Sequence, residues 1–97
     1  MDIPTALDVI YQAIDSLNEL RAADDQIEKS ISVMLAGEGG VLDSLGLITL
    51  TLAVERRIAQ MTGKQIILLH ESDYDANMSH LATPQTIAEL IVERASA

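Results

Sequence analysis

The stretch GGVLDSLGLITL, residues Gly39–Leu50, places a serine between a glycine-rich segment and a run of aliphatic residues. Glycine clusters mark loops, whereas apolar residues three or four positions apart indicate one face of a helix. Gly63 would suit the C-cap of that helix. We therefore predict a helix from Ser44 to about Gly63. Its predicted apolar face consists of Leu45, Ile48, Leu52 and Ile58.

Ser44 has two possible roles. Spacing alone favours the N-cap of the helix, because serine is among the preferred residues there. The alternative is an attachment site, since a phosphate ester would be stabilised by the positive end of the helix dipole and by unpaired N–H groups. No base lies near Ser44 in the sequence, so another enzyme would have to attach the group. Asp43 could help to bind the magnesium that accompanies a phosphate donor.

Two further helices are predicted on either side of this one. The first runs from about Pro4 to about Ala22, with Asp2 as its cap. Its apolar face consists of Leu7, Ile10, Ile14 and Leu17. The last begins in ATPQTIAELIVERA, with Thr83 as the N-cap and Pro84 in the first helical position. Its apolar face consists of Ile87, Leu90 and Ile91.

The connections are longer and less periodic. Residues 23–40 form a long loop, within which IEKSISVML is ambiguous between a short helix and an extended segment. QIILLH is a short β-rich run that cannot make a sheet alone, and SDYDANM could form one helical turn. A chain of 97 residues is the usual size of one domain. We predict one domain over residues 1–97, built as a small all-α bundle with long loops.

Composition excludes several classes of function. The formal net charge of −9 disfavours nucleic acids and favours basic patches on partner proteins. No apolar run reaches the length of about 20 residues that a membrane span needs, and the N-terminus lacks a basic signal-peptide region. We therefore expect a cytoplasmic protein without a membrane span. The chain has no cysteine, so any thiol chemistry must be imported, and with few aromatics the core must be aliphatic.

Metal and catalytic motifs are incomplete. Asp73, Asp75 and Asn77 alternate like the start of an EF-hand loop, but Met78 and Pro84 stand where that loop needs Gly and Glu. The two histidines lack metal-ligand spacing, and GEGG lacks the rest of a phosphate-binding P-loop. We predict no metal site and no catalytic triad.

The motif LDSLG, placed at the start of the second helix, resembles the acyl carrier protein family, and the likeness covers nearly the whole chain. The resemblance implies a four-helix bundle of three longer helices and one short helix, with a long first loop. It implies that a phosphopantetheinyl transferase, recognising Asp43, attaches 4′-phosphopantetheine from coenzyme A to Ser44. The arm's thiol would hold an acyl group as a thioester, and the protein, a monomer, would catalyse nothing itself. Its partners would be an acyl- or aminoacyl-activating enzyme and a downstream acyltransferase or synthase.

The expected partner-docking face departs from the fatty-acid type. Such carriers have acidic residues two and five positions after the serine, where this chain has Gly46 and Thr49. Arg56 and Arg57 replace further acids, leaving Glu55 as the retained carboxylate. The docking residues implied by the resemblance are Leu45, Gly46, Thr49, Glu55 and Arg56. We expect ordinary fatty-acid enzymes to use this protein poorly and its own partners to dock through a more apolar surface.

The cargo and the class have alternatives. Gly46 and the sequence ATPQTI are also similar to D-alanyl carrier proteins and peptidyl carrier domains, although the tryptophan usual before the D-alanyl family's Thr-Pro is absent. A specialised acyl carrier is therefore the prediction and an aminoacyl carrier the alternative. A helical adaptor without a prosthetic group, or less plausibly a small hydrolase using Ser44, would represent other classes.

Overall fold

The described part of the chain is entirely helical. A computed structural model describes residues 1–37, 39–68 and 81–95, and of Ser44 it describes the backbone. Over these residues it contains three α-helices, α1 (Ile3–Asn18), α2 (Ser44–Thr62) and α3 (Pro84–Ala95), one 3₁₀ helix η1 (Ala23–Asp25), and no strand. The prediction of an all-α chain is confirmed for this part. The predicted short helix in SDYDANM lies outside the described residues.

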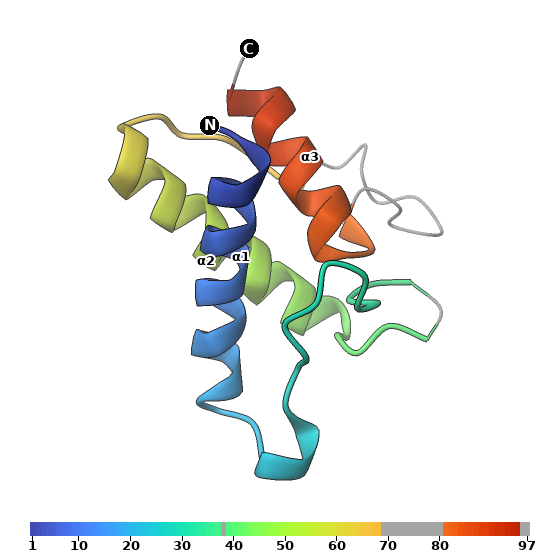
Figure 1. Cartoon of the computed structure of the whole chain (residues 1–97). Helices are drawn as coiled ribbons and strands as arrows, with labels where there is room; N and C mark the ends of the chain where they lie inside the picture. The colour runs from blue at the N-terminus through green and yellow to red at the C-terminus, as the bar shows by residue number, and fades with distance from the viewer. Residues whose placement is uncertain (38, 69–80, 96–97) are drawn as a thin grey trace.

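Helix α1 is the centre of the arrangement, because it packs against both α2 and α3 (Figure 1). Its cap is Asp2, whose carboxylate accepts a hydrogen bond from the Thr5 N–H at 2.9 Å. Ile10 and Ile14 are fully buried, as predicted. The buried hydrophobic side chains of the described residues are all Ala, Val, Ile or Leu, so the aliphatic core is confirmed for this part.

Helix α1 ends at Asn18, earlier than the predicted Ala22. The Asn18 side chain forms two hydrogen bonds with the backbone of Ile27, donating to its carbonyl at 3.0 Å and accepting from its N–H at 2.7 Å. Leu20, beyond the helix end, is 91% exposed. The hydrogen bonds of Asn18 thus join the end of α1 to the chain that returns after η1, which short-range periodicity does not reveal.

The loop before α2 is folded back on itself. The Val41 N–H donates to the Met34 carbonyl at 2.9 Å, and the Leu42 N–H donates to the Leu35 carbonyl at 3.0 Å. The ambiguous segment 27–35 is thus neither helix nor regular strand, and the Leu35 N–H also donates to the Ala82 carbonyl at 2.7 Å. These hydrogen bonds link the loop that precedes α2 to Ala82, just before α3.

The apolar face predicted for α2 is wrong in large part. Leu45 and Leu52 are 73% and 53% exposed, and Ile48 is half-buried; of the predicted set only Ile58 is buried. The residues that face the core are Leu47, Leu50, Thr51, Val54 and Ile58. The helix is aliphatic on both sides, so two sets of residues have helical spacing and α1 covers only one of them.

Helix α3 confirms its sequence prediction. The Thr83 hydroxyl accepts a hydrogen bond from the Thr86 N–H at 3.2 Å, as an N-cap does, and the helix begins at Pro84. The predicted apolar face is buried: Ile87, Leu90 and Ile91. Residues 64–68, which precede the undescribed segment, contain no strand, so the described part of QIILLH is irregular.

Candidate functional site

The start of α2 is capped by Asp43 and not by Ser44. The Asp43 carboxylate accepts a hydrogen bond from the Gly46 N–H at 2.7 Å, while its backbone carbonyl accepts from the Leu47 N–H at 2.9 Å. Ser44 is the first helical residue. The N-cap prediction for Ser44 is therefore wrong, because Asp43, one position earlier, already occupies that role. The helix begins at the serine, as predicted.

Gly46 lies in a confined position within this first turn. A Cβ atom there would lie 3.1 Å from Leu42 Cδ2 and 3.2 Å from Asp43 Oδ1, both closer than ordinary contact. A carboxylate at position 46 would also stand beside the carboxylate that caps the helix. The close contacts at position 46 thus favour glycine, which explains why this chain has no acid two positions after the serine.

The loop that leads into this turn also depends on a glycine. A Cβ atom on Gly40 would lie 2.8 Å from the Leu35 carbonyl oxygen and 2.9 Å from the Ala36 carbonyl carbon. Both of these are backbone atoms. Gly39, beside it, has φ of +80°. Gly39 and Gly40 therefore belong to a tight turn that leads the chain toward Asp43.

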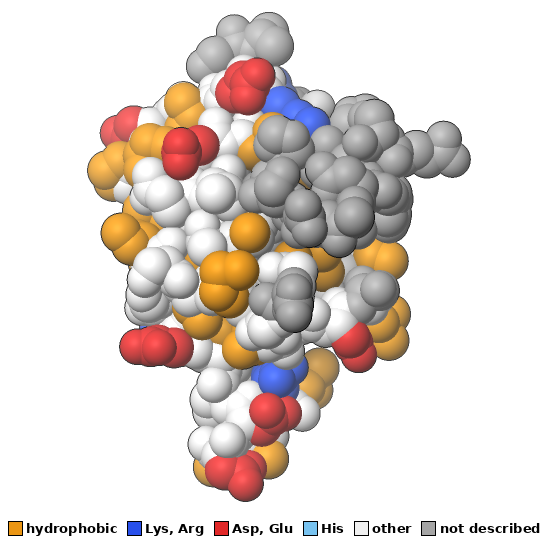
Figure 2. Space-filling view, turned by 90° about the vertical axis from the view of Figure 1, so that its right-hand side faces the viewer, with side chains coloured by type: hydrophobic (Ala, Val, Ile, Leu, Met, Phe, Trp, Pro, Cys, Tyr) orange, Lys and Arg blue, Asp and Glu red, His pale blue; other side chains and the backbone are white. Residues whose placement is uncertain are grey.

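Exposed aliphatic residues flank the start of α2. Leu45 follows Ser44 directly, and Met34 and Val41 in the folded-back loop are also exposed. On the face shown in Figure 2, hydrophobic side chains lie in the middle and also at the left and right edges, with acidic side chains interspersed among them. The site is thus an accessible helix start with apolar neighbours inside a strongly acidic protein.

The other docking candidates lie along α2. The Thr49 hydroxyl donates to the Leu45 carbonyl at 2.8 Å, within its own helix. Leu45, Gly46 and Thr49 therefore lie in the first turns, close to Ser44. Glu55 and Arg56 follow in the second half of the helix, about 16–18 Å further along its axis at the standard rise per residue. The helix brings the first three residues together with the serine and leaves the last two apart from it.

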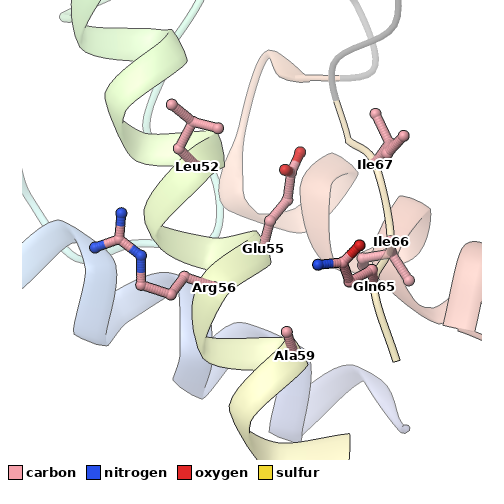
Figure 3. Close-up of a pocket in the computed structure, with 7 residues that line it drawn as sticks. All are labelled: Leu52, Glu55, Arg56, Ala59, Gln65, Ile66 and Ile67. Atoms are coloured by element: carbon pink, nitrogen blue, oxygen red, sulfur yellow. The ribbon is translucent and has the colours of Figure 1, made fainter. Parts of the chain in front are cut away.

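A groove runs between the second half of α2 and the segment that follows the helix. It has a volume of about 370 Å³ and is lined by Leu52, Glu55, Arg56, Ala59, Gln65, Ile66 and Ile67. In Figure 3, Glu55 extends across it toward the 65–67 segment, whereas Arg56 leaves the helix on the other side. The Glu55 carboxylate accepts a hydrogen bond from the Leu68 N–H at 2.8 Å, so this acid holds the segment in place. Glu55 thereby has a structural role that its sequence position does not indicate.

Arg57, which the sequence marks only as a base in place of an acid, connects two helices. Its guanidinium donates hydrogen bonds to Gln12 Oε1 at 3.0 Å and to Ser16 Oγ at 3.2 Å, joining α2 to α1. No sequence signal identifies these partners, because they lie more than forty positions away.

Comparison of the chain with protein-family models, with curated proteins and with solved structures gives no significant match. The resemblance to carrier proteins therefore rests on the residues around Ser44 and on their place in the fold. Within residues 1–37, 39–68 and 81–95, no helix combines the length and apolarity that crossing a membrane requires. The same ranges contain no cluster of three acidic or histidine side chains suited to a metal ion.

Proposed function

We propose that the protein is a carrier protein of the acyl-carrier type, with Ser44 as the attachment point of 4′-phosphopantetheine. The observation that carries the proposal is the cap of α2. Because Asp43 caps the helix, the serine that follows it is not needed for that purpose. The two neighbours of this serine, Asp43 and Leu45, are both exposed, which supports access by a modifying enzyme.

The residues at this helix start fit such a group. A phosphoester at Ser44 would lie at the positive end of the α2 dipole, where negative charge is stabilised. The neighbouring Asp43 carboxylate accepts the Gly46 N–H, which fixes its direction at the helix start. Leu45 and Gly46 leave the surroundings of the serine apolar or bare. When attached, the arm supplies the terminal thiol that this cysteine-free chain lacks, and that thiol holds the cargo as a thioester.

The proposal includes a four-helix bundle of three longer helices and one short helix. It also includes a phosphopantetheinyl transferase, an acyl- or aminoacyl-activating enzyme and a downstream acyltransferase or synthase as partners. The exposed faces of Leu45 and Leu52, together with the absence of acids at positions 46 and 49, support docking through apolar contact. The cargo is an acyl group, with an aminoacyl group as the alternative.

Incubation with coenzyme A and a broad-specificity phosphopantetheinyl transferase tests the proposal. We expect a mass gain of one phosphopantetheinyl group, carried by the peptide that contains Ser44. Ser44→Ala should abolish the gain and keep its helical circular dichroism. Ser32→Ala, which changes an exposed serine of the preceding loop, is the matched control and should be modified normally. An unmodified wild-type chain would favour an adaptor, and ester turnover a hydrolase.

A further inference from the structure

Arg56 and Arg57 differ from the other basic residues of the chain in what they contact. Of the six basic side chains, two form ion pairs with aspartates and two donate to backbone carbonyls. These are Arg21 with Asp25, Lys29 with Asp15, Lys64 with the Ala95 carbonyl and Arg94 with the Ile67 carbonyl. In the part of the chain that the structure describes, neither Arg56 nor Arg57 forms an ion pair. Two adjacent cations of a protein with net charge −9 are thus without an acidic partner among the described residues.

Arg57 is held in place by neutral groups. Gln12 and Ser16 each accept one hydrogen bond from its guanidinium, which fixes the direction of the side chain without neutralising its charge. A guanidinium has five N–H donors, so further donors remain after these two bonds. Holding the fork in advance lowers the entropy cost of binding a planar anion. The contacts therefore pre-organise a positive charge on the surface between α1 and α2.

The two arginines line a common hollow. It has a volume of about 250 Å³, and its other lining residues are Ser16, Ala53 and Gln60. Arg56 also lines the groove into which Glu55 extends, but its guanidinium points away from Glu55 on the other side of α2, as Figure 3 shows. The hollow thus combines two guanidinium groups with a hydroxyl, an amide and one small apolar side chain.

We propose that this hollow is a binding site for a carboxylate. Guanidinium forks bind carboxylates through two parallel hydrogen bonds, and the Gln60 amide can add a donor. Ala53 offers an apolar contact to the carbon that bears the carboxylate. Phosphate shares the hydrogen-bonding geometry, but as a dianion it is repelled more strongly by the overall negative field of this chain. The carboxylate can belong to a small molecule or to an Asp or Glu side chain of a partner, and the site does not depend on modification of Ser44.

Nuclear magnetic resonance titration of the ¹⁵N-labelled protein tests this site. The probes are sodium acetate, N-acetyl-glutamate methylamide and the matched N-acetyl-glutamine methylamide, at an ionic strength held constant with sodium chloride. We expect saturable shifts of the Ser16, Arg57 and Gln60 amide signals with both carboxylates and none with the glutamine compound. Tighter binding of the glutamate compound assigns the site to protein side chains, and equal or tighter binding of acetate assigns it to small carboxylates. No saturation, or stronger binding of sodium phosphate, would overturn the proposal.

Variants then test the assignment of the residues. Arg56→Gln removes an exposed side chain that forms no ion pair among the described residues, and we expect it to raise the carboxylate Kd by about 1.4- to 5-fold, the range for one exposed ion pair. Arg56→Gln combined with Arg57→Gln should abolish saturation. Arg21→Gln, which removes a basic residue elsewhere, should leave the Kd unchanged. If the double variant does not fold, the carboxylate Kd of Arg56→Gln alone tests the proposal. An unchanged Kd in that variant overturns it.

Discussion

Replacing Asp43 by alanine should destabilise the protein more than replacing Ser44 by alanine. Asp43→Ala removes the acceptor of the 2.7 Å hydrogen bond from the Gly46 N–H and a negative charge at the helix start. Loss of an N-cap costs about 0.5–2 kcal/mol, typically about 1 kcal/mol. In a domain of this size, about 1 kcal/mol corresponds to a fall in Tm of about 4–8 °C. Ser44→Ala should change stability by no more than about 0.5 kcal/mol, as for surface positions without a special role.

Asp43→Asn separates the two parts of this effect. Asparagine caps helices about as well as aspartate, so this variant keeps the hydrogen-bond acceptor and loses only the charge. The charge at a helix N-terminus contributes about 0.3–1 kcal/mol at low ionic strength, and salt screens it. We therefore expect Asp43→Asn to lie between wild type and Asp43→Ala, and to approach wild type at high salt.

Urea denaturation followed by circular dichroism measures these differences, with the m-value as a control for two-state unfolding. An unchanged m-value shows that the shift in midpoint is a change in stability and not in the compactness of the unfolded state. The reasoning is refuted if Ser44→Ala is as destabilising as Asp43→Ala, because the serine would then be the residue that caps α2. This outcome is independent of whether Ser44 carries a group.

Two further predictions follow from the described contacts. Leu50→Ala should lower the free energy of unfolding by about 2–5 kcal/mol, because Leu50 is fully buried. Leu52→Ala, on the exposed side of α2, should lower it far less. Equal losses of stability in urea denaturation would contradict the observed orientation of the helix. Hydrogen bonds from Thr5, first through its side chain and then through its backbone N–H, lower the pKa of Asp2. The ionised Asp2 carboxylate therefore stabilises the fold at pH values above the ordinary aspartate pKa. This stabilisation is lost as the pH falls through the lowered pKa. Asp2→Asn should remove the acid sensitivity that is due to Asp2 from denaturation curves measured across the acid range. An acid dependence equal to that of the wild type would contradict the stabilising role of Asp2.

The sequence was sufficient wherever a short stretch of the chain contains its own structural signal. Thr83 followed by Pro84 predicts the start of α3, and Gly63 predicts the end of α2, where it adopts φ of +72°. Capping hydrogen bonds and left-handed glycines involve neighbours within a few positions, so these predictions did not require the rest of the fold. The start of α2 at Ser44 was also predicted, although the residue that caps it, Asp43, was not.

The tertiary structure decided what depends on partners distant in the sequence. Both sides of α2 are aliphatic, and only packing against α1 determines that Leu50 is buried while Leu45 and Leu52 are exposed. The end of α1 depends on hydrogen bonds between Asn18 and Ile27, and the orientation of Arg57 depends on Gln12 and Ser16 of α1. Hydrophobic spacing states which residues can share a face, but burial depends on which face another helix covers, and that is settled only when the helices pack together.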